Sequence, residues 1–294
     1  MNGWRDALLN DFLALHCSGM PTQLYWQRVQ TYPDPAFWLR RSSAFYRQFA
    51  LADSVVSRLQ VVDSRAVDQL CAWAQQRDCH IVLPVDKNYP RCLFAVAKPP
   101  LLLFVRGHCA LLSQPQLAVV GSRNATWYGL ETATTWSEQL AAECLLTSGM
   151  AFGVDAAAHW AALRAGHASI AVLGLGVDKI YPRAHTGLYH ALAAQGVIVS
   201  EYCWMQGYHR GVFAQRNRII SALADAVLVV EAGERSGALI TARCAFELAK
   251  PVFAVPGRVT QPHSLGCHRL IQQGAHCVVS PQDVRSMLAM RSRG

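Results

Sequence analysis

Lysine is scarce in this chain. It supplies only four of the 27 basic residues, and arginine supplies the others. Charged residues are only 16% of the sequence and hydrophobic residues are 52%, a balance that excludes a disordered protein and suffices for a large core. A guanidinium group holds phosphate oxygens in pairs and stacks on flat rings, so an arginine-rich net charge of +8 favours an anionic polymer or a nucleotide as partner. A GC-rich genome would explain the ratio of arginine to lysine equally well, but not the positive sign.

Uninterrupted apolar runs of membrane-spanning length are also missing. The longest candidate, Leu93 to Val105, contains Lys98, Pro99 and Pro100, whereas a membrane span needs roughly 18 or more apolar residues. The N-terminus carries charged residues where a signal peptide needs an apolar stretch. The ten cysteines are scattered, without a C-x-x-C pair. The sequence therefore predicts reduced thiols and a cytoplasmic protein.

Common cofactor motifs are absent or incomplete. No P-loop of the form G-x-x-x-x-G-K-S/T occurs, which argues against ATP hydrolysis by that route. The segment from Gly174 to Gly176 begins like a dinucleotide fingerprint, but Lys179 stands where a third glycine or alanine is needed. The histidines and cysteines of residues 263–277 match no common zinc spacing, and His159 has no nucleophile at a recognisable spacing. We expect no cofactor, no metal and no catalytic residue.

Two patterns divide the chain. Residues 1–75 have the apolar spacing of short helices, with turn signals at Ser18-Gly19 and Pro33-Asp34-Pro35, and predict a small helical domain. Strands then alternate with helices over residues 76–290, and nothing after Asp283 predicts a further domain. The expected strands are 80–85, 101–107, 116–122, 144–149, 169–174, 196–201, 226–231, 251–257 and 275–280.

The last seven of these runs are apolar throughout rather than alternating, as in strands that a parallel sheet buries on both faces. The pattern predicts a doubly wound α/β fold with a mostly parallel sheet, whose ligand lies at the carboxyl ends of the strands. Asp155 is expected to begin the helix after the second of these strands. The roles of Asp225 and Glu231, which flank the 226–231 strand, stay open.

Small and basic residues follow several of these strands. Glycine lets the backbone approach a ligand, and the next helix N-terminus offers free N–H groups, so together they favour a bound phosphate, although each glycine alone is also an ordinary turn residue. Arginines follow the same strands and are expected to converge on one rim as phosphate clamps. The arginines are Arg123, Arg183, Arg216 and Arg218. Aromatic residues beside them suit base stacking on an unpaired strand, although loop packing would explain about half of them. They are Tyr202, Trp204, Tyr208, His209 and Phe213.

Several motifs together resemble the DNA-processing protein A (DprA/Smf) family. They are, in order, AVVGSRNATWYG, TSGMAFGVDAAAH, IAVLGLGVDKIYPR, VSEY, QRNRIISALADAVLVVEAGERSGALITA and VFAVPG. The resemblance implies an extended Rossmann-like domain over residues 76–290, a sterile-alpha-motif-like (SAM-like) helical domain over residues 1–75, and no winged-helix domain after the sheet. It implies a non-enzymatic protein that protects incoming single-stranded DNA, forms a homodimer and loads the recombinase RecA in natural transformation.

The same resemblance assigns residues to sites. The implied DNA and phosphate site consists of Gly121, Ser122, Arg123, Ser148, Gly149, Gly153, Gly174, Gly176, Arg183, Arg216, Asn217, Arg218, Ser236 and Gly237. The implied dimer interface consists of His268, Leu270 and Ile271. Phe152 stands where a basic residue is common, and Gln215 replaces a frequent arginine. These departures predict fewer positive charges and a weaker grip on DNA.

A different class of function competes with DNA binding. Related Rossmann-type enzymes hydrolyse nucleoside monophosphates and carry a P-G-G-x-G-T motif. The corresponding stretch here, EAGERSGALIT, lacks that motif and favours DNA binding. A nucleotide-sensing or scaffold protein would share the fold but would leave the basic rim unexplained.

Overall fold

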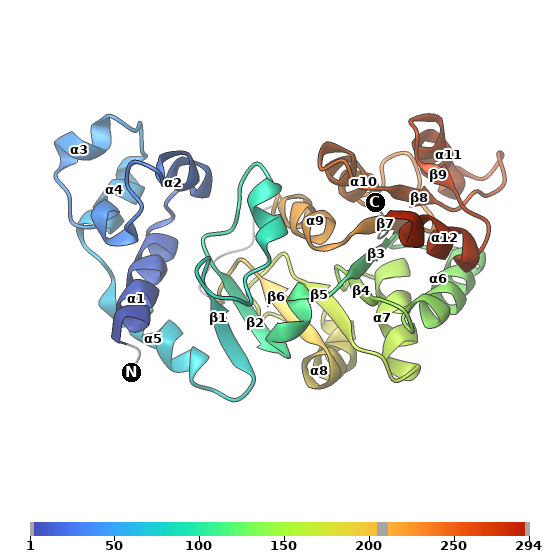
Figure 1. The fold of residues 1–294 in the computed structure, drawn as a ribbon, viewed down its shortest axis with the longest axis horizontal. Coiled ribbons are helices and arrows are strands. Elements are labelled where there is room, and N and C mark those ends of the chain that lie inside the picture. The colour runs from blue at the N-terminus through green and yellow to red at the C-terminus, as the bar shows by residue number, and fades with distance from the viewer. Residues whose placement is uncertain (1–2, 205–210, 292–294) are drawn as a thin grey trace. The chain divides into compact units, whose positions relative to one another are not determined.

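The computed structural model describes residues 3–204 and 211–291 (Figure 1). The chain divides into two compact units. The first comprises Met1–Tyr89 and Ala97–Leu103, and the second comprises Pro90–Val96 and Phe104–Gly294. None of the helices in the described ranges is long and apolar enough to cross a membrane.

The first unit is mainly helical. Its elements are α1 (Gly3–Ser18), α2 (Thr22–Arg28), α3 (Ser43–Arg47), α4 (Asp53–Gln60), α5 (Ser64–Ala74) and the strand β1 (Cys79–Val82). The α1 helix ends before Gly19, whose φ of +76° is a conformation that favours glycine. The Asp63 side chain accepts a hydrogen bond from the Ala66 N–H and so begins α5. Large side chains such as Trp38 and Tyr46 are fully buried and form the core.

A mostly parallel sheet organises the second unit. Its strands are β2 (Leu103–Gly107), β3 (Gln116–Val120), β4 (Leu145–Ser148), β5 (Ser169–Val172), β6 (Val197–Ser200), β7 (Ala226–Val229), β8 (Val252–Ala254) and β9 (His276–Cys277). They lie in the order β2-β6-β5-β4-β3-β7-β8-β9, and β2 is antiparallel to β6 while the other pairs are parallel. The chain moves outward from β3 to β6 and then returns to β7 on the other side of β3. This reversal is a topological switch point.

Helices cover both faces of this sheet. They are α6 (Trp127–Leu140), α7 (Val154–Arg164), α8 (Thr186–Gln195), α9 (Val212–Leu223), α10 (Ala238–Glu247), α11 (Leu265–Gln272) and α12 (Pro281–Arg291). Leu117 and Val119 of β3 pack with α6, α7 and α12 in one buried cluster. Side chains alternate along a strand, so α9, which contacts β3, β4 and β5, covers the opposite face. Figure 1 shows α9 and α10 on one side of the sheet and α7 and α8 on the other.

The expected doubly wound, mostly parallel α/β fold is confirmed. Strands β3, β5, β6, β7 and β8 are buried along their whole length, which explains why their sequences are apolar without alternation. At the edge of the sheet, β9 contains only two residues, His276 and Cys277, and both are exposed. The run predicted over 275–280 is therefore mostly irregular.

Candidate functional site

The loops after β3 and β4 are fastened to each other at the carboxyl ends of the strands. The Ser122 N–H donates to the Glu231 carbonyl oxygen at 2.7 Å, and the Val154 N–H donates to the Ser122 carbonyl oxygen at 3.2 Å. Gly153 has a φ of +75°, and a Cβ at this position would overlap the Ser122 carbonyl oxygen. The close contact therefore requires glycine. It fixes the main chain of the loop and leaves the Arg123 side chain exposed.

Arg216 lies beneath these loops. Its side chain is on α9, only 4% of the residue is exposed, and its Nη1 donates to the carbonyl oxygens of Gly149, at 2.7 Å, and of Val172. Burial lowers the pKa of Arg216 to about 10, although the charge of Asp155 opposes the fall and that of Arg123 adds to it, so the group still carries its proton at neutral pH. Arg216 holds the ends of β4 and β5 together. Its expected place on the exposed rim is therefore wrong.

The neighbours of Arg216 on α9 are also engaged within the protein. The Asn217 side chain accepts from Arg216 Nε at 3.2 Å and donates to the Gly237 carbonyl oxygen at 3.1 Å. Arg218 forms two hydrogen bonds with the Glu201 carboxylate, at 2.9 and 2.6 Å. Both carboxylate oxygens of Glu201 are thereby bound to one guanidinium group. The charge of Arg218 is largely balanced by this partner.

Other predicted residues fix loops by their hydrogen bonds or by their small size. The Ser148 hydroxyl donates to the Val119 carbonyl oxygen at 2.6 Å, and the Ser236 hydroxyl accepts from the Ala238 N–H, at 3.3 Å, where α10 begins. A Cβ at Gly121 would lie 2.5 Å from Val154. Three further predicted glycines, Gly149, Gly174 and Gly176, also lie too close to other protein atoms to accept a Cβ. Their role as close-packing positions is visible, whereas Gly237 lies in open space.

An exposed surface of cations and rings lies above this framework. The Arg123 guanidinium group is 5.6 Å from the centre of the Phe213 ring, and that ring stacks on Tyr181 at 5.4 Å. Arg183 is exposed two residues after Tyr181, and within residues 3–204 and 211–291 its guanidinium group forms no ion pair. Cation–π pairs of this kind contribute about 0.5–1 kcal/mol at exposed sites, so Arg123 stays free to exchange partners.

Phe152 extends the same surface from the loop after β4. Its ring is 47% exposed and meets the His185 ring edge-on at 4.7 Å. The His185 Nδ1 atom lies 3.0 Å from the Met150 carbonyl oxygen, so this histidine fastens the β4 and β5 loops together. We call this set, in which His185 and Phe213 are half-buried and the other side chains exposed, the strand-end surface. It comprises Arg123, Phe152, Tyr181, Arg183, His185 and Phe213.

Two buried titratable groups lie below the strand-end surface. The Asp155 carboxylate, in the first turn of α7, accepts from the N–H groups of Gly149, at 3.2 Å, and Ala151, at 3.3 Å. Burial raises the pKa of Asp155, and the charge of Arg216 opposes this rise. His159 is fully buried against Ser169, and burial lowers its pKa to about 3, so it is neutral. His159 is therefore a buried residue of the core.

Of the aromatic cluster expected after β6, Tyr202, Trp204 and Phe213 fall in the part of the chain that the structure describes, and Tyr208 and His209 lie outside it. The Tyr202 hydroxyl donates to the Gln215 side chain at 3.0 Å. Gln215 therefore replaces the charge of an arginine with a neutral hydrogen bond at the edge of the site.

The residues predicted to form the dimer interface are buried or half-buried within their own unit. Leu270 of α11 is 4% exposed and packs inside its own unit, so it offers little surface to a partner, and its place in a dimer interface stays a prediction. His268 is half-buried, with its Nε2 atom 3.0 Å from the Gly257 carbonyl oxygen. Ile271 is half-buried. In the described ranges, no three His, Cys, Asp or Glu side chains come together as metal ligands.

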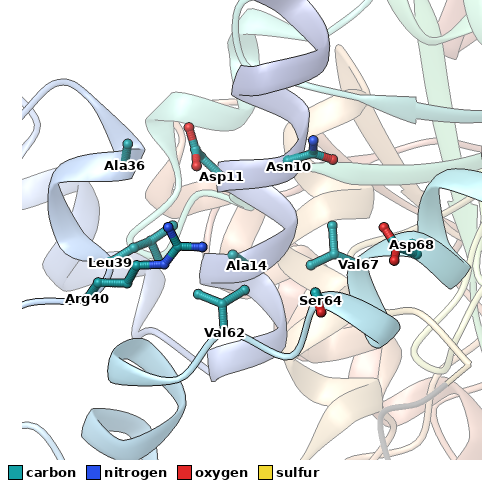
Figure 2. Close-up of a pocket in the computed structure, with 10 residues that line it drawn as sticks. All are labelled: Asn10, Asp11, Ala14, Ala36, Leu39, Arg40, Val62, Ser64, Val67 and Asp68. Carbon is teal, nitrogen blue, oxygen red and sulfur yellow. The ribbon is translucent and has the colours of Figure 1, made fainter.

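A hollow of about 270 Å³ lies in the first unit (Figure 2). Asp11 of α1 and Arg40 line it, together with Asp68 of α5. Burial raises the pKa of Asp11, the charge of Asp34 adds to this rise, and Arg40 opposes it. None of the residues that the sequence predicted for the DNA site lines this hollow.

Comparisons with known proteins agree with the architecture of the second unit. The sequence model of the family described as DNA recombination-mediator protein A matches residues 80–289. The chain is 40% identical over 255 residues to Protein Smf of Escherichia coli, an alignment that covers 85% of this chain and 68% of that protein. It is 42% identical over 200 residues to DNA processing protein DprA of Streptococcus pneumoniae, covering 68% and 71% of the two chains.

Solved structures extend the comparison to the whole fold. The structure of DNA processing protein A from S. pneumoniae superposes with a TM-score of 0.83 at 33% identity, over 94% of this chain and 97% of that chain. DNA processing protein A from Helicobacter pylori, whose structure was reported for its single-stranded DNA binding mode, gives a TM-score of 0.65 at 30% identity, over 70% and 95%. The resemblance of the sequence motifs is thereby confirmed, and the chain belongs to the DNA recombination-mediator protein A family.

Proposed function

We propose that this protein binds single-stranded DNA along the strand-end surface without catalysing a reaction. Arg123 and Arg183 bind backbone phosphates, and the rings of Phe152, Tyr181 and Phe213 stack on unpaired bases. The observation that carries the proposal is the Arg123 guanidinium group above the Phe213 ring, which in turn stacks on Tyr181. A guanidinium group that can bind phosphate next to aromatic rings that can stack on bases supports contacts with both parts of a single strand.

The exposed rings favour a single strand over a duplex. Tyr181 is 51% exposed although it is aromatic, so part of its ring is left in contact with water. Bases within a duplex are covered by their neighbours, whereas an unpaired base offers a free face for stacking. The single-stranded DNA binding mode reported for the H. pylori relative supports the same class of partner.

The other predicted residues contribute by positioning the strand-end surface. Arg216 joins the β4 and β5 ends, Asn217 joins α9 to Gly237, and Arg218 is balanced by Glu201. None of these groups has to leave its partner for DNA to bind at Arg123. We expect their replacement to alter the fold before it alters the DNA contacts.

Membership of the family supports a proposal for the cellular role. We propose that the protein protects incoming single-stranded DNA in the cytoplasm and loads RecA onto it during natural transformation and DNA recombination, as a homodimer. RecA filament growth on DNA coated with this protein tests the loading step. If RecA filaments grow no faster with the protein than without it, the loading role is refuted while DNA binding stands.

Binding of a labelled oligo-dT, followed by fluorescence anisotropy over a range of salt concentrations, tests the DNA site. The logarithm of affinity should fall linearly with the logarithm of salt, because phosphate binding releases counterions. Arg123→Ala and Arg183→Ala should each weaken binding and reduce this slope by about 0.7, the value for one phosphate of a single strand. Arg164→Ala is the matched control, since Arg164 is equally exposed but lies at the opposite end of α7 from Gly153.

Two results would count against the proposal. Equal or tighter binding of blunt duplex would reject the preference for single strands, and wild-type slopes in both arginine variants would reject the position of the site. A panel of nucleoside monophosphates tests the competing enzymatic role. Turnover that oligo-dT leaves unchanged would favour a hydrolase instead.

A further inference from the structure

A second cavity lies at the topological switch point of the sheet. It is lined by none of the residues of the strand-end surface. Its volume is about 560 Å³. Thr126, Trp127 and Tyr128 line it at the beginning of α6, Glu231 lines it just after β7, and His263 lines it before α11. Because β3 and β7 are neighbours although the chain visits three other strands between them, the crevice outside their carboxyl ends is the place where α/β sheets most often bind ligands.

The carboxylate of Glu231 is held firmly in this cavity. Glu231 is only 4% exposed. Its Oε1 accepts from the Thr126 N–H at 3.1 Å, and its Oε2 accepts from the Thr126 hydroxyl at 2.5 Å. A Cβ on Gly129 would lie 2.7 Å from Oε2, so glycine at that position makes room for the carboxylate. The Thr126 N–H also lies 3.4 Å from Oε2. A carboxylate has about four acceptor positions, so these bonds to Thr126 still leave acceptor capacity for a ligand in the cavity.

Flat side chains and cations form the other walls. Trp127 is 75% exposed, and Tyr128 is 49% exposed with its hydroxyl 3.4 Å from the Pro256 carbonyl oxygen. Arg258 and His263 line the cavity from the segment after β8, and His263 Nδ1 is 3.8 Å from Glu231 Oε1. Rings that stack on a base, a carboxylate that accepts from its edge and the Arg258 guanidinium group, which suits a phosphate, form a chemical set that matches one nucleotide.

The carboxylate selects among the bases. Guanine presents two adjacent donors on its pairing edge, N1–H and the 2-amino group, which match the two oxygens of a carboxylate. Adenine and cytosine present one donor beside an acceptor, and thymine presents one donor between two carbonyl oxygens that a carboxylate repels. The preference follows from the donor and acceptor pattern of each base.

We infer that the cavity beside Glu231 binds a guanine base, carried either by single-stranded DNA or by a free guanine nucleotide. In the first case the inference rests on the proposed function, and the cavity adds base selectivity to a surface that otherwise binds any sequence. The short loop from Ser122 to Thr126 connects Arg123 of the strand-end surface with Thr126 of the cavity.

The contact between Glu231 and Thr126 also stabilises the beginning of α6, where a negative charge is favourable. That role alone predicts no difference between bases. A measured preference for guanine that depends on the Glu231 carboxylate therefore separates ligand recognition from a purely structural role.

The experiment compares oligo-dT with the same oligonucleotide carrying several guanines in its centre, and with a third in which hypoxanthine replaces guanine. Hypoxanthine lacks the 2-amino group. The wild-type protein should bind the guanine oligonucleotide about tenfold tighter than oligo-dT, in the range expected for one bidentate base contact, and hypoxanthine should lose most of this gain. Glu231→Gln and Trp127→Ala should each bring the guanine-to-thymine ratio close to one. Trp4→Ala removes a similarly exposed tryptophan from the first unit and should leave the ratio unchanged.

The outcomes separate the two proposals. If oligo-dT does not bind, the proposed function fails. If oligo-dT binds but guanine gives no gain, and GMP raises the Tm of neither the wild type nor Glu231→Gln, the cavity inference fails alone. A rise in Tm with GMP that Glu231→Gln abolishes supports the cavity and identifies a free nucleotide as its source. A guanine preference that persists in Glu231→Gln overturns the role of the carboxylate, and the hypoxanthine oligonucleotide decides the case if that variant does not fold.

Discussion

Replacing Arg216 by methionine separates an arginine that builds the site from those that contact DNA. Methionine keeps much of the length of the side chain and removes its charge and all of its donors. The carbonyl oxygens of Gly149 and Val172 lose their donor, and the buried carboxylate of Asp155 loses its nearest cation. The change therefore removes one half of a buried charged network.

The magnitude follows from that loss. Removing a buried charge that compensates a carboxylate and donates to main-chain carbonyls destabilises a protein by about 3–5 kcal/mol, because the remaining buried groups lose their compensation. A domain of about 150–250 residues loses about 2–4 °C of Tm per kcal/mol, so the Tm should fall by about 10 °C. Arg216→Lys keeps the charge but not the planar guanidinium group, so its Tm should lie between that of Arg216→Met and that of the wild type.

The loss should depend on pH in a definite direction. Burial raises the pKa of Asp155, and Arg216 opposes that rise, so the pKa rises further when Arg216 is absent. A carboxyl group whose pKa is higher in the folded than in the unfolded state stabilises the protein at low pH, and this contribution is lost as the pH increases through the folded-state pKa. The deficit of Arg216→Met relative to the wild type should therefore be smaller near about pH 5 than near about pH 8.

Thermal unfolding followed by circular dichroism at both pH values measures these effects. Arg164→Met is the control. Arg164 is exposed in the same unit, so the Tm of this variant should equal that of the wild type. A wild-type Tm for Arg216→Met would refute the structural role of this arginine. An equal deficit at both pH values would refute the coupling between Arg216 and Asp155.

Three further predictions concern single side chains. Phe213→Ala should weaken oligo-dT binding by about 1–3 kcal/mol in the anisotropy assay, the loss expected for one stacked base, and unchanged affinity would remove Phe213 from the DNA path. Gly153→Ala should lower the free energy of unfolding by more than about 1 kcal/mol and so shift the urea midpoint downward, because alanine is strained at a positive φ; a wild-type midpoint would show that the loop can rearrange. Leu270→Ala should lower the free energy of unfolding by about 2–5 kcal/mol and leave the oligomeric state, measured by light scattering, unchanged. A variant of wild-type stability that dissociates into monomers would show instead that Leu270 lies in an interface.

The strands of the second unit were predictable because a strand that is buried on both faces consists almost entirely of apolar residues. Every apolar run proposed from residue 116 onward contains a strand, since a parallel sheet covered by helices on both sides excludes polar side chains from its centre. The ends of these strands were predictable for the same reason. Most of these apolar runs end at glycine or serine, because the loops that follow the strands pass close to one another and need small residues there.

The burial of Arg216 was missed although the sequence contains a signal for it. Val212, Arg216, Ile219 and Leu223 are spaced by four, three and four residues, which places them on one face of a helix. That face is the buried one. Helical periodicity would have separated Arg216 from its neighbour Arg218, whereas the motif match treats both as one basic cluster.

The cavity beside Glu231 could not be predicted in the same way. Thr126 and Glu231 are 105 residues apart, and they meet only because β7 lies beside β3. Apolar runs predict that strands exist, but they do not give the order of the strands within the sheet. Both acidic residues that flank β7 were therefore left without a role, although Asp225 accepts from the Gln116 N–H at 3.0 Å and joins the same two strands at their other end.

The scarcity of lysine has a physical explanation in the way the strand-end arginines are used. Arg216 forms hydrogen bonds to main-chain carbonyls inside the protein, and Arg218 binds both oxygens of Glu201. Each task needs a planar group with several donors, which lysine lacks. Only Arg123 and Arg183 of the predicted cluster keep their charge at the surface, so the net charge overstates the positive charge available to DNA. The exposed Phe152 adds a ring rather than a charge to the strand-end surface, so the proposed binding of a single strand should depend more on stacking and less on salt.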